Sequence, residues 1–196
     1  FRKHRGFSHA SIRGAIIANL KARRFVRGAS TISMQLSKNL FLGREKTLSR
    51  KLEEVLLTTY LEQVFDKDAL IELYLNVVEF GPDLYGITDA AEHYFGRSPN
   101  ELNLAEAFFL ASLLPSPLRY HRMYEKGEVS PGWLRHLHQL MEISEQRGAL
   151  TSGELAEGLA APIVFYKGVG ARPEPRSPAA PERRHRAPGV DWQEAE

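Results

Sequence analysis

The sequence predicts a mainly α-helical protein. Apolar residues recur at the spacing of one helical face through most of the first 165 residues, and capping side chains stand before several of these runs. No stretch alternates apolar and polar residues clearly enough to indicate a half-buried strand. With 196 residues, 43% of them apolar, the chain has enough apolar side chains for one domain with a core.

The first half is expected to form four helices. The first covers residues 12–20 and ends in a basic loop, and the turn at residues 28–31 caps a second helix that ends at Gly43. Thr47 or a neighbour begins a longer third helix, whose apolar face contains Leu48, Leu52, Val55 and Leu56, with Tyr60, Leu61 and Val64 broadening it. Asp66 caps a fourth helix, which stops before the break at residues 81–83.

The second half is expected to form shorter helices and then a tail. Gly86 opens one helix, and the capping pair Asn103 and Glu106 precedes an apolar, buried helix over residues 104–114. Further helices are expected over residues 133–144 and after Thr151. From residue 168 the chain is rich in Pro, Arg, Ala and Glu, so we expect a domain of residues 1–167 and a flexible tail of residues 168–196.

Charge is strongly segregated along the chain. Residues 1–51 carry a net charge of +12, which leaves about −10 on the remainder. The partner is therefore expected to be anionic: a nucleic acid, an anionic membrane surface or a phosphate-bearing substrate. The absence of cysteine excludes a disulfide scaffold and a cysteine nucleophile. The longest apolar stretch, residues 107–114, is too short to span a membrane.

Glu54 is the leading candidate for chemistry. It shares one helix face with Lys46 and Arg50, because the three residues are four positions apart. A carboxylate among cations stays ionised and can orient a hydroxyl or a sugar, while the cations can stabilise a phosphate leaving group. The alternative is an ordinary surface ion pair between Arg50 and Glu54, which contributes little free energy.

A second candidate cluster lies at the start of the second helix. Ser30, Thr31, Gln35 and Lys38 supply hydroxyl, amide and ammonium groups that suit a sugar hydroxyl and a phosphate oxygen. The alternative for the two hydroxyls is ordinary helix capping. His4 lies in a cationic stretch without further ligands at the spacing of a zinc site, so no metal site is predicted.

Five motifs in a fixed order resemble those of the family 51 glycosyltransferases, the peptidoglycan polymerases. Residues 28–35 are similar to the family's Gly-x-Ser-Thr-Ile-Thr-Gln-Gln motif, and residues 50–54 are similar to its Arg-Lys-x-x-Glu motif. The other three matches lie at residues 67–76, 85–96 and 106–117. The resemblance covers about residues 1–165 and implies a lysozyme-like helical glycosyltransferase domain.

The resemblance also implies an activity and its partners. The family joins lipid II units through β-1,4 bonds, with inversion and release of undecaprenyl diphosphate. The implied partners are lipid II, the growing glycan strand, a membrane surface and a cell-wall synthesis complex, but no nucleic acid. The implied location is the outer, periplasmic face of the cytoplasmic membrane, with an N-terminal anchor outside this sequence. No obligatory cofactor is expected, and assistance of the diphosphate by Mg²⁺ or Mn²⁺ is left open.

Matched motif by motif, Glu54 falls on the family's second essential carboxylate. Three cations, Lys38, Lys46 and Arg50, fall on phosphate-contacting positions, and Lys51 lies beside them. Ser30 and Gln35 fall on substrate-contacting positions, and Thr31 and His4 complete the expected substrate site. Residues 1–6 match only the second half of the family's first motif, Glu-Asp-x-x-Phe-x-x-His-x-Gly. The implied general base is its leading Glu, which would lie before Phe1, so these 196 residues are expected to be inactive alone.

Two other functions stay open at the level of sequence. A catalytically silent module that binds lipid II would account for Ser8 and Met34, which stand where the family commonly has Asp and Gln. A basic helical nucleic-acid binder would account for the +12 segment alone, and it predicts an affinity for duplexes that falls steeply with salt.

Overall fold

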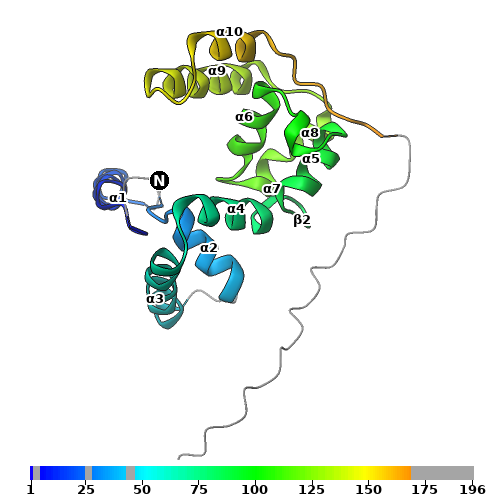
Figure 1. Ribbon diagram of the computed structural model, residues 1–196. Coiled ribbons are helices and arrows are strands. Elements are labelled where there is room, and N and C mark those ends of the chain that lie inside the picture. The colour runs from blue at the N-terminus through cyan, green and yellow to red at the C-terminus, as the bar shows by residue number, and fades with distance from the viewer. Residues whose placement is uncertain (2–4, 25–27, 43–46, 169–196) are drawn as a thin grey trace, which may run out of the picture.

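The computed structural model describes residues 1, 5–24, 28–42 and 47–168, and it is mainly α-helical, as predicted (Figure 1). The helices in chain order are α1 (His9–Ala22), α2 (Ile32–Phe41), α3 (Leu48–Val64), α4 (Lys67–Val77), α5 (Ile87–Phe95), a 3₁₀ turn η1 (Pro99–Glu101), α6 (Leu104–Leu113), α7 (Pro117–Tyr120), α8 (Arg122–Lys126), α9 (Pro131–Gln146) and α10 (Ser152–Ala160). The predicted helix end at Gly43 and almost all of the predicted tail lie outside the described residues.

Side-chain caps fix most of the helix starts. The capping side chains predicted for α2, α3, α4, α6 and α10 each accept a hydrogen bond from an amide group in the first turn: Thr31, Thr47, Asp66, Asn103 and Thr151. The first helix starts three residues earlier than predicted, because Ser8 caps it by accepting from the amide of Ser11 at 3.2 Å. Each such cap stabilises its helix by about 1 kcal/mol. Capping residues are therefore strongly preferred at helix starts, and these boundaries could be predicted from the sequence.

A short hairpin takes the place of the predicted break at residues 81–83. Strands β1 (Glu79–Gly81) and β2 (Leu84–Tyr85) pair antiparallel, and Asp83 in the turn has a φ of 54°. Strands of three and two residues are too short to show an alternating pattern, so the sequence did not predict them. The hairpin buries Phe80 and supplies a backbone carbonyl that accepts from the Tyr94 hydroxyl at 2.9 Å.

Helix α3 has its predicted apolar face turned to the outside. An apolar helix face normally packs on the core, yet Leu48, Leu52 and Leu56 are 87%, 68% and 71% exposed. Of the predicted apolar face only Leu61 is buried, and the other buried residues of α3 are Glu54 and Thr58. The polar stripe of the helix therefore faces the interior of the protein, toward α2, which α3 contacts closely.

The second half contains the main apolar core. Helix α6 is buried as predicted and packs against α9 and α10, while α5 packs against α4, α6 and the hairpin. The largest buried side chains of this region are Phe80, Tyr94, Phe109, Leu110, Leu113, Leu137 and Met141. In Figure 1 this half forms a continuous group of helices, and α1, α2 and α3 lie at the opposite end of the molecule.

Residues 161–167 return from α10 to the core as an extended strap (orange in Figure 1). Phe165 is buried, with its ring centroid 6.0 Å from that of Phe95 and 5.1 Å from that of Phe109. The amide of Tyr166 donates to the carbonyl of Tyr94 at 2.8 Å. The strap thus covers the core between α5 and α6, although Phe165 lies more than 50 residues further along the chain.

We predict that Phe165→Ala lowers the free energy of unfolding by about 3–5 kcal/mol, because it leaves a cavity among aromatic rings. Val164→Ala is the matched control, since its side chain is 65% exposed and its loss should cost less than about 0.5 kcal/mol. Urea unfolding followed by circular dichroism measures both. Equal losses in the two variants would show that the strap is not part of the core.

Candidate active site

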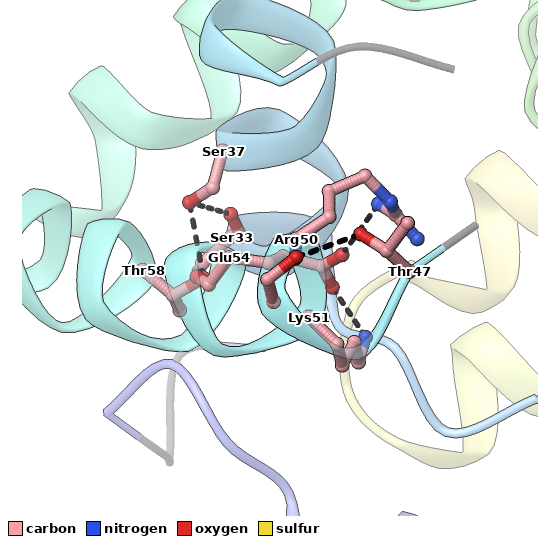
Figure 2. Close-up of polar contacts among 8 residues, drawn as sticks. Ser33, Ser37, Thr47, Arg50, Lys51, Glu54 and Thr58 are labelled. Carbon is pink, nitrogen blue, oxygen red and sulfur yellow. Dashed lines mark hydrogen bonds and ion pairs between the residues drawn. The ribbon is translucent and has the colours of Figure 1, made fainter. Parts of the chain in front are cut away.

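Glu54 is buried between two cations of its own helix. Its side chain is only 4% exposed, Arg50 Nη1 lies 3.3 Å from Oε2, and Lys51 Nζ lies 2.5 Å from Oε1 (Figure 2). Burial of a carboxylate is costly unless both oxygens have partners, and here each oxygen has its own cation. The interpretation of Arg50 and Glu54 as an ordinary surface pair is therefore wrong. Of the predicted stripe, the contact of Glu54 with Arg50 is seen, and Lys46 lies outside the described residues.

Arg50 retains a donor that no described residue uses. Its Nε is buried and makes no hydrogen bond within the part of the chain that the structure describes. Buried donors are normally satisfied, so a bound acceptor such as a phosphate oxygen would complete this group. The guanidinium thus faces Glu54 through Nη1 and keeps capacity for a further anionic partner.

A seam of hydroxyl groups joins α2 to α3 beside Glu54. Ser37 donates to the carbonyl of Ser33 at 3.0 Å and lies 3.0 Å from the Thr58 hydroxyl, which donates to the Glu54 carbonyl at 2.6 Å (Figure 2). Ser33, Ser37 and Thr58 are fully buried. The seam fixes the turn of α3 that carries Glu54 against α2.

The sequence analysis missed this seam, although its spacing is visible in the sequence. Thr58 and Glu62 continue the stripe of Arg50 and Glu54 at further steps of four residues. A polar stripe that continues along most of a helix could have indicated a buried polar face, although a helix face that packs on a neighbour is normally apolar.

Two of the predicted site residues meet at a cleft near the start of α2. Ser30 is exposed and lines, together with Phe1, Ser8, Ser11, Thr31 and Ile32, a cleft of about 300 Å³. The Thr31 hydroxyl accepts from the amide of Met34 at 3.3 Å and donates to the carbonyl of Gly6. The capping role of Thr31 is thus confirmed, and its hydroxyl is already used within the fold.

Gln35 is held by a tyrosine from α4. The Tyr74 hydroxyl donates to Gln35 Oε1 at 2.7 Å, and Tyr74 is 3% exposed. Burial raises the pKa of Tyr74 to about 12, so the hydroxyl stays a donor throughout the physiological range. This contact orients Gln35, and the sequence analysis did not find it because the two residues are 39 positions apart.

The remaining predicted residues are only partly placed. Lys38 is exposed on α2, directly after Ser37 of the seam, and Lys51 is 44% exposed while it contacts Glu54. His4 and Lys46 lie outside the described residues. Among the residues that the structure describes, no three His, Asp or Glu side chains are grouped so that they could hold a metal ion.

A helical domain with a buried carboxylate between cations on α3, and with a hydroxyl-lined cleft at the start of α2, has the groups that sugar and phosphate chemistry requires. The family model described as Transglycosylase matches residues 1–141, and the chain belongs to this family. The resemblance to the peptidoglycan glycosyltransferases found in the sequence is confirmed by that match.

Named relatives agree with the family. The chain is 44% identical over 135 residues to a biosynthetic peptidoglycan transglycosylase of Nitrosomonas eutropha, which covers 69% of this chain and 54% of the relative. It is 38% identical over 167 residues to penicillin-binding protein 1A of Aquifex aeolicus, which covers 85% of this chain and 22% of the relative. The chain therefore spans about half of the first relative and about a fifth of the second.

One solved structure, penicillin-binding protein 1A from Haemophilus influenzae, matches with a TM-score of 0.41 and 23% sequence identity. The match covers 70% of this chain and 17% of that chain.

We predict that Tyr74→Phe weakens the alkaline loss of stability. The pKa of Tyr74 is raised from 10.0 in the folded state, so the folded state keeps a proton that the unfolded chain releases. The free energy of unfolding should therefore fall as the pH rises from 10 to about 12, and Tyr74→Phe should reduce this slope.

Urea unfolding at several pH values between 9 and 12 measures the slope. Tyr60→Phe is the matched control, because it removes the same hydroxyl from a side chain that is 60% exposed. Tyr94, whose pKa burial also raises, keeps part of the slope in both variants. A slope that Tyr74→Phe does not alter would contradict the prediction.

Proposed function

We propose that the protein is a peptidoglycan glycosyltransferase, which polymerises lipid II into β-1,4-linked glycan strands and releases undecaprenyl diphosphate. The observation that carries the proposal is the buried Glu54 between Arg50 and Lys51, beside an Arg50 Nε that no described residue accepts from. The names of the relatives support it, since two of which this chain covers 54% and 63% are called biosynthetic peptidoglycan transglycosylases.

The cations are suited to the leaving group. When the bond between the donor sugar and the diphosphate breaks, negative charge grows on the diphosphate, and fixed cations stabilise that charge. Arg50 and Lys51 are held in place by Glu54, and the exposed Lys38 adds a third charge from α2. Lys46 is proposed as a fourth cation from its position in the sequence.

Glu54 acts in this proposal as the group that positions the cations. Both of its oxygens are already bound, to Arg50 and to Lys51, which suits a charged acceptor and not a group that removes a proton. Proton removal from the acceptor sugar's 4-hydroxyl therefore falls to another group.

The cleft beside α2 suits the sugars of the substrate. Its lining offers the hydroxyls of Ser11 and Ser30, which can donate hydrogen bonds, and the apolar ring of Phe1. The Ser8 hydroxyl already donates to Ser11 Oγ at 2.9 Å and accepts from the Ser11 amide. Gln35, oriented by Tyr74, supplies an amide on the same helix.

The two departures from the family pattern have structural roles. Ser8 caps α1, and Met34 is buried on α2 with 7% exposure. The described contacts of the Glu54 carboxylate are with Arg50 and Lys51, and they include neither Ser8 nor Met34.

The described donors fit a phosphate better than a divalent cation. Mg²⁺ and Mn²⁺ require oxygen ligands, whereas both oxygens of Glu54 are occupied by cationic side chains. No step of the proposed reaction is therefore assigned to a metal ion.

We predict that the chain binds a lipid II analogue in detergent micelles, and that Lys38→Ala and Arg50→Ala each weaken binding about tenfold or more. Loss of a charge-assisted contact costs about 1.5–3 kcal/mol, which corresponds to that range. Titration followed by fluorescence anisotropy measures the affinity, and Lys38→Ala is the cleaner variant because Lys38 is exposed.

Arg135→Ala is the matched control, since it removes the same charge from an exposed position on α9. Duplex DNA at the same salt concentration tests the rival function. A folded chain that ignores the lipid II analogue, or that prefers DNA, would overturn the proposal.

We further propose that α1, the end of α2 and α3 dock on the outer face of the cytoplasmic membrane. Large apolar side chains are exposed on all three helices: Ile16, Ile17, Leu20, Leu40, Phe41, Leu48, Leu52, Leu56, Tyr60 and Val64. The same half carries the +12 segment, which suits the anionic surface of a membrane. No described helix has the length and apolar character that crossing a bilayer requires.

Leu52→Ser combined with Leu56→Ser should reduce binding to vesicles with anionic lipids at least tenfold. Each exposed leucine that enters the lipid contributes about 1.5–3 kcal/mol of transfer free energy, so the double variant removes more than the tenfold change requires. Vesicle co-sedimentation measures the partition. Leu118→Ser combined with Val164→Ser is the control at the other end of the molecule, where both side chains are also exposed. Equal losses in the two double variants would contradict docking through α3.

A further inference from the structure

A buried ion pair joins the end of α3 to the start of α4. Lys67 Nζ lies 2.7 Å and 2.6 Å from the two carboxylate oxygens of Glu62. The Glu62 side chain is 6% exposed and that of Lys67 is 20% exposed. The hydroxyl of Ser33 on α2 also donates to Glu62 Oε1, so the pair connects three helices.

The same pair lies against the N-terminal segment, by which we mean Phe1 and residues 5–8 before α1. Lys67 Nζ lies 4.4 Å from the centre of the Phe1 ring, which is cation–π geometry. Gly6 lies directly on α3, because a Cβ at this position would come within 2.9 Å of Thr58 Cγ2 and 3.2 Å of Glu62 Cγ. Its φ of +75° is also a conformation that favours glycine.

This segment forms one side of the hydroxyl-lined cleft. Phe1 and Ser8 line it from the segment, whereas Ser30, Thr31 and Ile32 line it from the start of α2. The position of Phe1 and Gly6 therefore sets the distance between the two sides, and the Thr31 hydroxyl, bound to the Gly6 carbonyl, ties them together.

We propose that the Lys67–Glu62 pair is a positioning pair that holds Phe1 and Gly6 against α3 and so shapes the cleft for the sugars of the substrate. This inference rests on the proposed function for the identity of the ligand. A buried ion pair is rarely more stabilising than an apolar pair of the same volume, so joining α3 to α4 does not by itself require charges. A cation at Lys67 is required for the contact with the Phe1 ring.

The test removes both charges and keeps the volume. In Glu62→Gln with Lys67→Met neither charge is left buried alone, so the domain should stay folded. Its affinity for the lipid II analogue should fall about five- to tenfold. Lys67→Arg alone keeps both the pair with Glu62 and the cation over Phe1, so it should retain most of the affinity, whereas a purely packing role would not distinguish Met from Arg.

Gly6→Ala tests the same segment while keeping both charges of the ion pair, because the added Cβ would press on the side chains of Thr58 and Glu62. It should weaken binding to a similar extent, and combining it with the Gln and Met double variant should add little. Gly153→Ala is the matched control, because a Cβ there meets no atom closer than 4.0 Å and the residue lies on α10.

Trypsin cleavage after Arg5 gives a readout that needs no ligand. Arg5 is exposed and precedes Gly6, so release of the segment should raise its cleavage rate several-fold, while cleavage after the remote Lys126 stays unchanged. Faster cleavage in the double variant, when even the wild type ignores lipid II, would support the positioning pair and overturn the proposed function. Unchanged cleavage, or unchanged affinity in a chain that binds lipid II, would overturn the positioning pair.

Discussion

The burial of a polar face on α3 determines much of the first half of the molecule. Arg50, Glu54, Thr58 and Glu62 follow one another at steps of four residues. The last two contact Ser37 and Ser33 of α2 and border Gly6, whereas Glu54 is paired within α3. The polar and apolar stripes of α3 lie on opposite sides of the helix. Packing the polar stripe against α2 therefore turns most of the apolar stripe toward solvent. The exposed leucines and the buried carboxylate are thus two consequences of one choice of orientation.

That orientation is costly for an isolated domain. Each large apolar side chain left in water forgoes about 1.5–3 kcal/mol, and the buried polar groups need complete hydrogen bonding to avoid a further penalty. The seam of hydroxyl groups meets the second requirement through Ser33, Ser37 and Thr58. In the proposed function the membrane covers the exposed apolar side chains. A single helix about 10 Å wide then separates the lipid from the charged site. A substrate with a lipid tail and a diphosphate needs both environments at that distance.

The second half supplies the rigid support. Its aromatic core, closed by Phe165, is packed in the ordinary way, and α4 extends from it to α2 through Tyr74. Leu70 and Tyr74 of α4 are buried, so the orientation of Gln35 is tied to the core and not to the exposed helices. In the proposed function, the helices that dock on the membrane are therefore different from the helix that orients Gln35.

The sequence predicted local features well and long-range ones poorly. Caps at Thr31, Thr47 and Asp66 marked helix starts because each depends on residues three positions apart. Glu54 was found because its cations lie within one turn of the same helix. The contacts of Tyr74 with Gln35 and of Lys67 with Phe1 join distant segments, and no spacing rule reports them. The burial of the polar face was missed because helical periodicity is normally interpreted with the apolar face inward.

In the proposed function, the charge balance around Glu54 explains why a site for an anion contains a carboxylate at all. Arg50 and Lys51 would repel each other if they stood alone in a partly buried position, and they would turn outward toward water. Glu54 cancels one of the two charges and fixes the direction of both, so the group keeps a net positive charge in a defined geometry. Preorganised charge of this kind stabilises a developing anion without rearrangement at the moment of reaction. A neutral side chain of similar size would leave the cations present but free to move, so the contribution of Glu54 lies in their placement.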